Sequence, residues 1–229
     1  MTAKGKETAL RSFQGGVYRA HDLLWLKPRA LSGKCGLPEW VAAFWTDDMP
    51  VVVRRDFSAD GLIPVGIRGR KRSERVATWI SRQDVVRKLS PEDIIDSLRI
   101  MEDVPFSGMK PVKALQMLLE TGWEAVWGVT GSCAFALATG LAVMHDESDL
   151  DLLVRCPEPV PKTHFSEVSE ILEQLPCRTD IQVEVPAGAF SLKEWLREGT
   201  GRVLLKTNQG PVLTVAPWQM KPLERQVDG

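Results

Sequence analysis

The sequence predicts an α+β protein in two parts, a smaller β-rich part and a larger part in which helices and strands alternate. Three observations support this. The 229 residues exceed a typical domain of about 150 residues. Short apolar runs between proline and glycine turns fill the first part. Beyond residue 111 helical and strand patterns alternate. Because prolines and a glycine crowd residues 104–111, we expect domains at 1–106 and 107–229.

The first part is predicted to consist of short strands joined by turns. The expected strands are residues 17–19, 23–26, 49–54 and 62–67, with a helical turn at 40–45. Ser90 then precedes Pro91 and two acidic residues. A serine cap, proline in the first turn and acids near the positive end of the dipole predict a helix from Ser90 to about Met101.

The second part is predicted to form a mixed sheet with helices. The expected helices are 112–120, 132–138, 163–175 and 191–197, and the expected strands are 123–129, 150–154, 181–185, 202–206 and 212–215. The uncharged stretch 125–145 has the length of a membrane span. Its glycines and hydroxyl residues favour a buried strand, a turn and a short helix instead.

Composition excludes several classes of protein. Lys and Arg total 29 against 30 Asp and Glu, which gives a net charge of −1, and 44% of residues are hydrophobic. These values exclude a disordered tail, a collagen-like fibre and a basic nucleic-acid coat. The pI of about 6.3 argues against a nucleic-acid partner. The four cysteines form no C-x-x-C pair and the N-terminus lacks a secretory signal, so we expect a cytoplasmic protein with reduced thiols and no membrane contact.

An acidic motif at residues 148–154 carries the sharpest chemical signal. Side chains alternate along a strand, so Asp149 and Asp151 are expected on one face while Leu150 and Leu152 enter the core. Two carboxylates so close repel each other unless a cation lies between them. Hard oxygens in this arrangement suit Mg²⁺. The alternative is an edge strand whose acids face water.

Two further segments extend this motif. The strand at 127–129 is followed by Gly131, Ser132 and a short helix, whose N-terminus offers N–H groups and a positive dipole end to phosphate. The alternative is a tight turn with a serine cap. Downstream, Asp180 and Glu184 are expected on one face of a strand, where a third carboxylate could hold a metal or accept a proton.

The order of these segments resembles the nucleotidyltransferase superfamily typified by polymerase beta. The resemblance covers residues 127–185 and implies a nucleotidyltransferase-like C-terminal domain. It implies that Gly131 and Ser132 hold a triphosphate and that Asp149 and Asp151 bind Mg²⁺, with Mn²⁺ as an alternative ion. Asp180 takes the place of the third catalytic acid, with Glu184 in reserve.

A second resemblance spans residues 18–195. The segments 21–26, 65–69, 127–132, 137–140 and 148–152 are similar to the malonate decarboxylase holo-acyl-carrier-protein synthases, which are phosphoribosyl-dephospho-CoA transferases. The resemblance implies transfer of a phosphoribosyl-dephospho-CoA group from its triphosphate precursor to a serine of the apo acyl carrier subunit, with release of pyrophosphate. Ser148 is assigned to substrate binding on this basis.

The stretch 68–88 concentrates positive charge. Eight Lys or Arg stand there against two acids, which suits an anionic substrate or an acidic carrier. Arg68 is the residue expected to bind substrate, since arginine makes bidentate phosphate contacts. The alternative is a solvated helix face over 74–88.

Two alternative functions remain open at this point. One is a nucleotidyltransferase that acts on another acceptor, such as an aminoglycoside, a tRNA end or the carrier of citrate lyase. The other is a protein of this fold that binds a nucleotide without catalysis.

Overall fold

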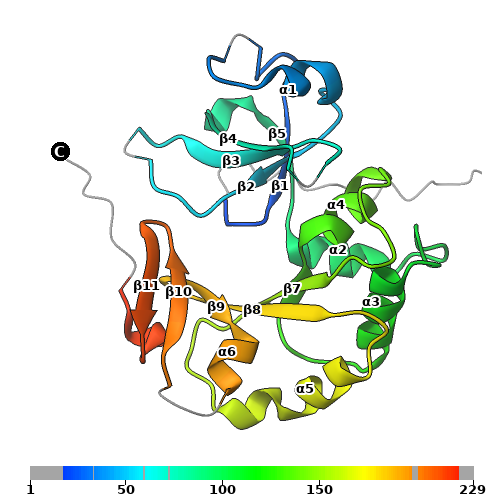
Figure 1. The fold of residues 1–229 in the computed structure, drawn as a ribbon, viewed down its shortest axis with the longest axis vertical. Coiled ribbons are helices and arrows are strands. Elements are labelled where there is room, and N and C mark those ends of the chain that lie inside the picture. The colour runs from blue at the N-terminus through cyan, green and yellow to red at the C-terminus, as the bar shows by residue number, and fades with distance from the viewer. Residues whose placement is uncertain (1–17, 33, 59, 72, 198–200, 222–229) are drawn as a thin grey trace, which may run out of the picture.

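Two β-sheets, one in each half of the chain, build the protein (Figure 1). The structure is a computed structural model that describes residues 18–221 except 33, 59, 72 and 198–200. The first sheet has the antiparallel order β4-β3-β2-β1-β5, and the second has the order β11-β10-β9-β8-β7-β6. The pair β7 and β8 is parallel, whereas its neighbours are antiparallel. The second sheet is therefore mixed, and the α+β prediction is confirmed.

The first half contains five strands and two short helical segments among its described residues. They are β1 Leu23–Leu26, α1 Glu39–Phe44, β2 Val51–Val53, β3 Ile63–Arg68, β4 Arg75–Ile80, η1 Arg82–Asp84 and β5 Val85–Leu89. The strands β1, β2 and β3 bury alternate or successive aliphatic side chains against α1 and its flanking turns.

The second half begins with α2 and continues as alternating helices and strands. The elements are α2 Pro91–Leu98, α3 Lys110–Glu120, β6 Trp127–Val129, α4 Gly131–Thr139, β7 Leu150–Arg155, η2 Lys162–Phe165, α5 Ser166–Glu173, β8 Thr179–Val185, β9 Gly188–Ser191, α6 Leu192–Leu196, β10 Val203–Thr207, β11 Gly210–Thr214 and η3 Pro217–Gln219. Helices α5 and α6 lie along the side of this sheet that faces away from the first half (Figure 1).

The helix predicted after Ser90 forms as expected but ends at Leu98. The Ser90 hydroxyl accepts from the N–H of Asp93, and the Asp93 carboxylate accepts from the N–H of Ser90, a reciprocal capping box. Its apolar residues Ile94, Ile95 and Leu98 join the core of the second sheet. The helix that precedes the expected boundary at residue 106 thus packs with the elements that follow it, and the boundary itself stays a prediction.

Several segments differ from what local patterns indicate. The expected strand 123–129 forms only as β6, and residues 123–126 lie outside any strand. The stretch 74–88 is not a helix but β4, η1 and β5, because Val76, Thr78 and Ile80 favour a strand that pairs with β3. Residues 18 and 19 of the expected strand 17–19 lie outside any strand, and residue 17 is outside the described residues. Strand β9 was not expected. A side chain at Gly188 would overlap the backbone of Lys206 on β10, so only glycine permits that pairing.

The uncharged stretch 125–145 folds as predicted into a strand, a turn and a buried helix, namely β6 and α4. In the part of the chain that the structure describes, no helix has both the length and the apolar character needed to span a membrane.

Asp22 is a buried carboxyl group beside β1. It is 0% exposed, and no described partner hydrogen-bonds to its Oδ1. Its Oδ2 accepts from the N–H of Arg19 and lies 3.9 Å from Lys88 Nζ. Burial outweighs these two favourable contacts and raises the pKa of Asp22 from 3.8 to about 6. The native state therefore retains a proton on Asp22 over a pH range in which the unfolded chain has lost it.

We expect Asp22→Asn to change the pH dependence of stability. A folded pKa above the unfolded one contributes stability below pH 3.8 that is lost as the pH rises to about 6. The unfolding free energy of the variant relative to wild type should therefore increase by about 2 kcal/mol between pH 4 and pH 7. His21, whose pKa is lowered to about 4 mainly by burial, titrates in both proteins and cancels in this difference. Urea unfolding at both pH values measures it, and a difference independent of pH would contradict this reading of Asp22.

Candidate active site

Asp151 and Asp180 lie side by side at the start of two neighbouring parallel strands. They are register partners in the β7–β8 pair. Partners in a parallel pair project to the same face of the sheet. The same face carries Gln182 and Glu184 on β8, as the alternation predicts. This face is turned toward the first half of the chain, because Arg55 from the first half forms an ion pair with Glu184.

Gly131 places the first turn of α4 directly against Asp151. Its φ of +67° is in the left-handed region, and a methyl group there would overlap the Asp151 carboxylate. The N–H of Thr130 donates to the carbonyl oxygen of Asp151 at 2.8 Å. The N-terminus of α4 thus lies against the start of β7 in a contact that only glycine allows.

The cap of α4 differs from the serine cap considered as an alternative. Thr130, not Ser132, is the N-cap residue, and its side chain makes no capping hydrogen bond. Its hydroxyl instead donates to the carbonyl oxygen of Asp151 at 3.3 Å. Ser132 is half-buried one residue into the helix. The N-cap side chain therefore does not occupy the N–H groups in the first turn of α4, and these groups can bind another acceptor.

Ser148 and Asp149 lead into β7. The Ser148 hydroxyl accepts from the N–H of His145 at 3.1 Å, and its own N–H donates to the His145 carbonyl at 2.9 Å, which closes a tight turn. Asp149 directly precedes the strand, with 48% of its side chain exposed and Arg178 Nε 3.9 Å from its Oδ1. Asp180 is exposed as well. Within the described residues, no three His, Cys, Asp or Glu side chains are placed to hold a metal ion by themselves.

Arg68 reaches from the last position of β3 to α4 in the other half. Its Nη2 donates to the Val143 carbonyl at 3.3 Å, and its guanidinium lies 5.7 Å from the centre of the Phe135 ring. Burial and the neighbouring Arg75 lower its pKa, whereas the charge of Asp151 raises it. The structure thus brings Arg68 near the acidic motif. Phe135 and Val143, which hold it there, carried no signal in the sequence.

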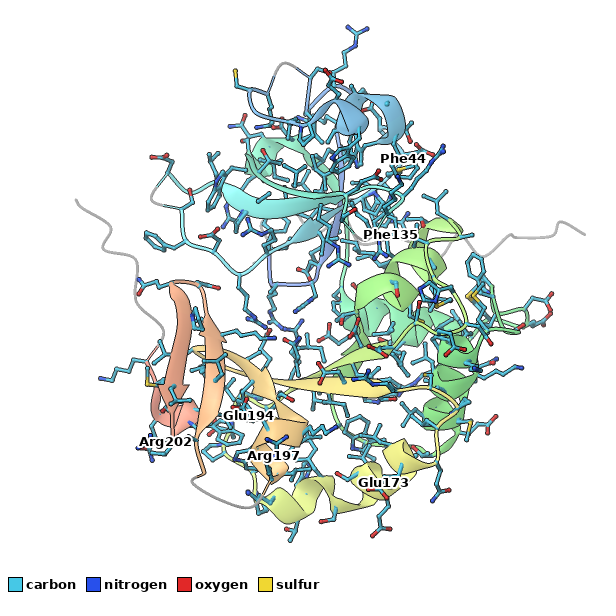
Figure 2. The ribbon with its side chains drawn as sticks, viewed as in Figure 1. Phe44, Phe135, Glu173, Glu194, Arg197 and Arg202 are labelled. Carbon is cyan, nitrogen blue, oxygen red and sulfur yellow. The ribbon has the colours of Figure 1, made fainter. Side chains whose placement is uncertain are left out.

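The rest of the basic stretch spreads over the first half instead of forming one patch. Arg70 lies over the ring of Phe44 on α1, in the first half, whereas Arg68 lies over the ring of Phe135 in the second half. Figure 2 labels both phenylalanines. Arg82 lies over Tyr18 and Arg87 over Trp25. Of the positive residues in this stretch, Arg68 is therefore the one that these contacts place at α4.

Glu184, the reserve candidate for the third acid, is committed to ion pairs. Its Oε2 lies 2.6 Å from Arg55 Nη2, and its Oε1 pairs with Arg155 on β7. Arg155 also contacts Glu92 on α2 at 2.5 Å. Burial raises the pKa of Glu92, but the hydrogen bond and charge of Arg155 outweigh it and leave that pKa below its usual value. Glu184 therefore fastens the two halves together, and Asp180 is the acid that stands opposite Asp151.

Comparison with protein families finds two adjoining matches. Residues 19–91 match the N-terminal domain and residues 97–217 the C-terminal domain of phosphoribosyl-dephospho-CoA transferase MdcG. The two matches meet around the start of α2, and the second contains every candidate catalytic acid.

Individual relatives are similar over nearly their whole length. A phosphoribosyl-dephospho-CoA transferase of Klebsiella pneumoniae strain 342 is 46% identical over 87% of this chain and 96% of its own. Transferases of the same name from Azotobacter vinelandii and Pseudomonas putida are 40% and 38% identical, each over 87% of this chain and over 93% and 95% of their own. No solved structure gave a significant match.

Proposed function

This chain belongs to the phosphoribosyl-dephospho-CoA transferase family, and we propose that it primes the acyl carrier subunit of malonate decarboxylase. The donor is the triphosphate precursor 2′-(5″-triphosphoribosyl)-3′-dephospho-CoA, and the acceptor is a serine of the apo carrier. The observation that supports this most is the contact of Gly131 with Asp151, beside Asp180. It joins a helix N-terminus, which suits phosphate, to carboxylates, which suit a divalent cation.

The first turn of α4 and Arg68 suit the triphosphate. A helix N-terminus supplies N–H donors and the positive end of the dipole. Ser132 follows Gly131 in that turn and can add a hydroxyl. Arg68 adds a positive charge from the first half, close to Asp151. Hydrogen-bonding groups from both halves would therefore hold the phosphates of the triphosphate substrate over the start of β7.

The carboxylates Asp149, Asp151 and Asp180 fit a magnesium site completed by the substrate. Mg²⁺ is typically held by one or two protein carboxylates together with phosphate oxygens and water. Two of these acids keep exposed oxygens, and the third contacts the phosphate-binding turn. We propose two Mg²⁺ ions, with Mn²⁺ as an alternative, which would neutralise charge on the triphosphate and on the leaving pyrophosphate.

The reaction is a substitution at the α-phosphorus. The serine oxygen forms a new bond to phosphorus, the bond from that phosphorus to the bridging oxygen of the pyrophosphate breaks, and pyrophosphate leaves with the bonding electrons. The serine proton passes to a base. Asp180, exposed beside Asp151, is placed to accept it or to share in metal binding. Positioning and charge neutralisation account for such a reaction without a protein nucleophile.

Weighing the carrier after reaction tests the proposal. The protein is incubated with Mg²⁺, the triphosphate donor and the apo carrier of malonate decarboxylase, and the carrier is analysed by mass spectrometry. A gain equal to the phosphoribosyl-dephospho-CoA group, absent when the acceptor serine is changed to alanine, supports it. The citrate lyase carrier serves as the competing acceptor. A gain on that carrier alone would overturn the malonate decarboxylase assignment.

We expect Arg68→Ala to weaken donor binding more than it slows chemistry. The guanidinium contributes charge to phosphate in the ground state as well as in the transition state, so KM for the donor should rise roughly tenfold with a smaller change in kcat. Steady-state kinetics measures both constants. Arg70→Ala is the matched control, since Arg70 also lies over a phenylalanine ring but in the first half. An unchanged KM in Arg68→Ala would exclude the role.

A further inference from the structure

A cleft lined by several arginines lies between the two halves, away from the acidic motif. The cleft has a volume of about 630 Å³ and is lined by residues 18–20, 53–58 and 61–64, Arg82, residues 155–157 and 184–188, and Asn208. The lining therefore combines the link between β2 and β3 with the turn that joins β8 to β9. Arg155 and Glu184 are four residues further along β7 and β8 than Asp151 and Asp180, or about 13 Å.

The cleft carries an excess of positive charge. Five arginines line it, against two acids. Glu184 is already shared by Arg55 and Arg155, and Asp56 lies 3.4 Å from Arg54. Within the described residues, no acid forms an ion pair with Arg19 or Arg82. A concave site with unmatched arginines attracts a compact anion.

Aromatic rings accompany these arginines. The Arg82 guanidinium lies 5.3 Å from the centre of the Tyr18 ring. Phe57, which lines the cleft from the link between β2 and β3, is 48% exposed. Exposed aromatic rings beside arginines suit a planar heterocycle that carries phosphate. The volume is within the range of small-molecule sites, about 300–1,000 Å³, which favours a small ligand over the convex surface of a carrier protein.

We propose, resting on the proposed function, that this cleft binds the dephospho-CoA portion of the donor, its adenine ring and 5′-diphosphate. The donor carries two anionic groups, the triphosphate and the diphosphate, at opposite ends of two linked riboses. The protein offers two corresponding places at opposite ends of β7 and β8. Between these two places, Leu153 on β7 is buried and offers no surface to a ligand. On β8, Asp180, Gln182 and Glu184 all keep exposed surface. The donor therefore lies along β8.

Binding of dephospho-CoA itself tests the proposal, because this probe has no triphosphate and cannot react. Calorimetry with Arg82→Ala should show binding at least tenfold weaker than with wild type, through loss of a charged hydrogen bond to phosphate. Phe57→Ala should weaken binding about fivefold through loss of stacking. Arg87→Ala is the matched control, since Arg87 is an exposed arginine of the same stretch that lies over a ring, Trp25, outside the cleft. It should bind as wild type does.

The outcomes separate this proposal from the proposed function. Equal affinity in Arg82→Ala and Arg87→Ala, or no binding of dephospho-CoA to wild type, would overturn the cleft assignment even if transfer to the carrier occurs. Weakened binding of the apo carrier but not of dephospho-CoA by Arg82→Ala would overturn it too, in favour of carrier docking. An effect of Arg82 on dephospho-CoA binding supports the cleft even if no carrier is labelled, a result that would refute only the proposed function.

Discussion

Asp151→Asn is expected to abolish transfer while the protein stays folded. The change keeps the size of the side chain but removes the charge that, under the proposed function, would help to hold a divalent cation beside the turn at Gly131. If the carboxylate supplies about 4 kcal/mol of transition-state stabilisation through that cation, the transfer rate should fall about a thousandfold. The rate of carrier labelling measures it, and titration of Mn²⁺ should show weakened metal binding in the same variant.

A control separates this effect from a general loss of negative charge. Asp96→Asn removes a carboxylate whose side chain is 73% exposed on α2 and whose ion pair with Arg99 lies at the surface. It should transfer as wild type does. Thermal unfolding of both variants checks that the fold is retained. Full activity of Asp151→Asn in a folded protein would exclude the metal role and leave the carboxylate as a structural partner of the turn.

Local patterns in the sequence predict the elements that flank this site. The strand at β7 follows from the alternation of Leu150 and Leu152 with acids, and α4 follows from the uncharged run after Gly131. The start of α2 follows from Ser90 and the residues after it. Each signal lies within a few residues of the element that it predicts, so a single segment contains enough information.

Contacts between distant segments could not be predicted in this way. The register that sets Asp180 opposite Asp151 depends on the pairing of two strands that a helix separates. Arg68 reaches α4 only because the two halves pack together, and its carbonyl partner Val143 is 75 residues away. The pairing of Glu184 with Arg55 spans 129 residues and turns a candidate catalytic acid into a link between the halves. Nothing near Glu184 in the sequence indicates this.

Gly131→Ala is expected to stop transfer by displacing Asp151. The substitution acts in two ways, through a backbone φ of +67° and through a methyl group that would overlap the Asp151 carboxylate. The first costs about 1–2 kcal/mol of stability. The second forces the carboxylate and the first turn of α4 apart, and a displacement of about 1 Å at a reacting centre costs about a hundredfold in rate. Carrier labelling and thermal unfolding measure the two effects separately.

Gly140→Ala distinguishes the two effects because it reproduces only the first. Gly140 ends the same helix with a φ of +72°, and an added methyl group would meet nothing within 4 Å. Both variants should lose similar stability from backbone strain, but only Gly131→Ala should lose transfer. If the two variants lost activity equally, the effect would come from strain in α4 and not from the overlap with Asp151. The close approach of helix and carboxylate would then have to be a packing feature of the sheet and not the basis of catalysis.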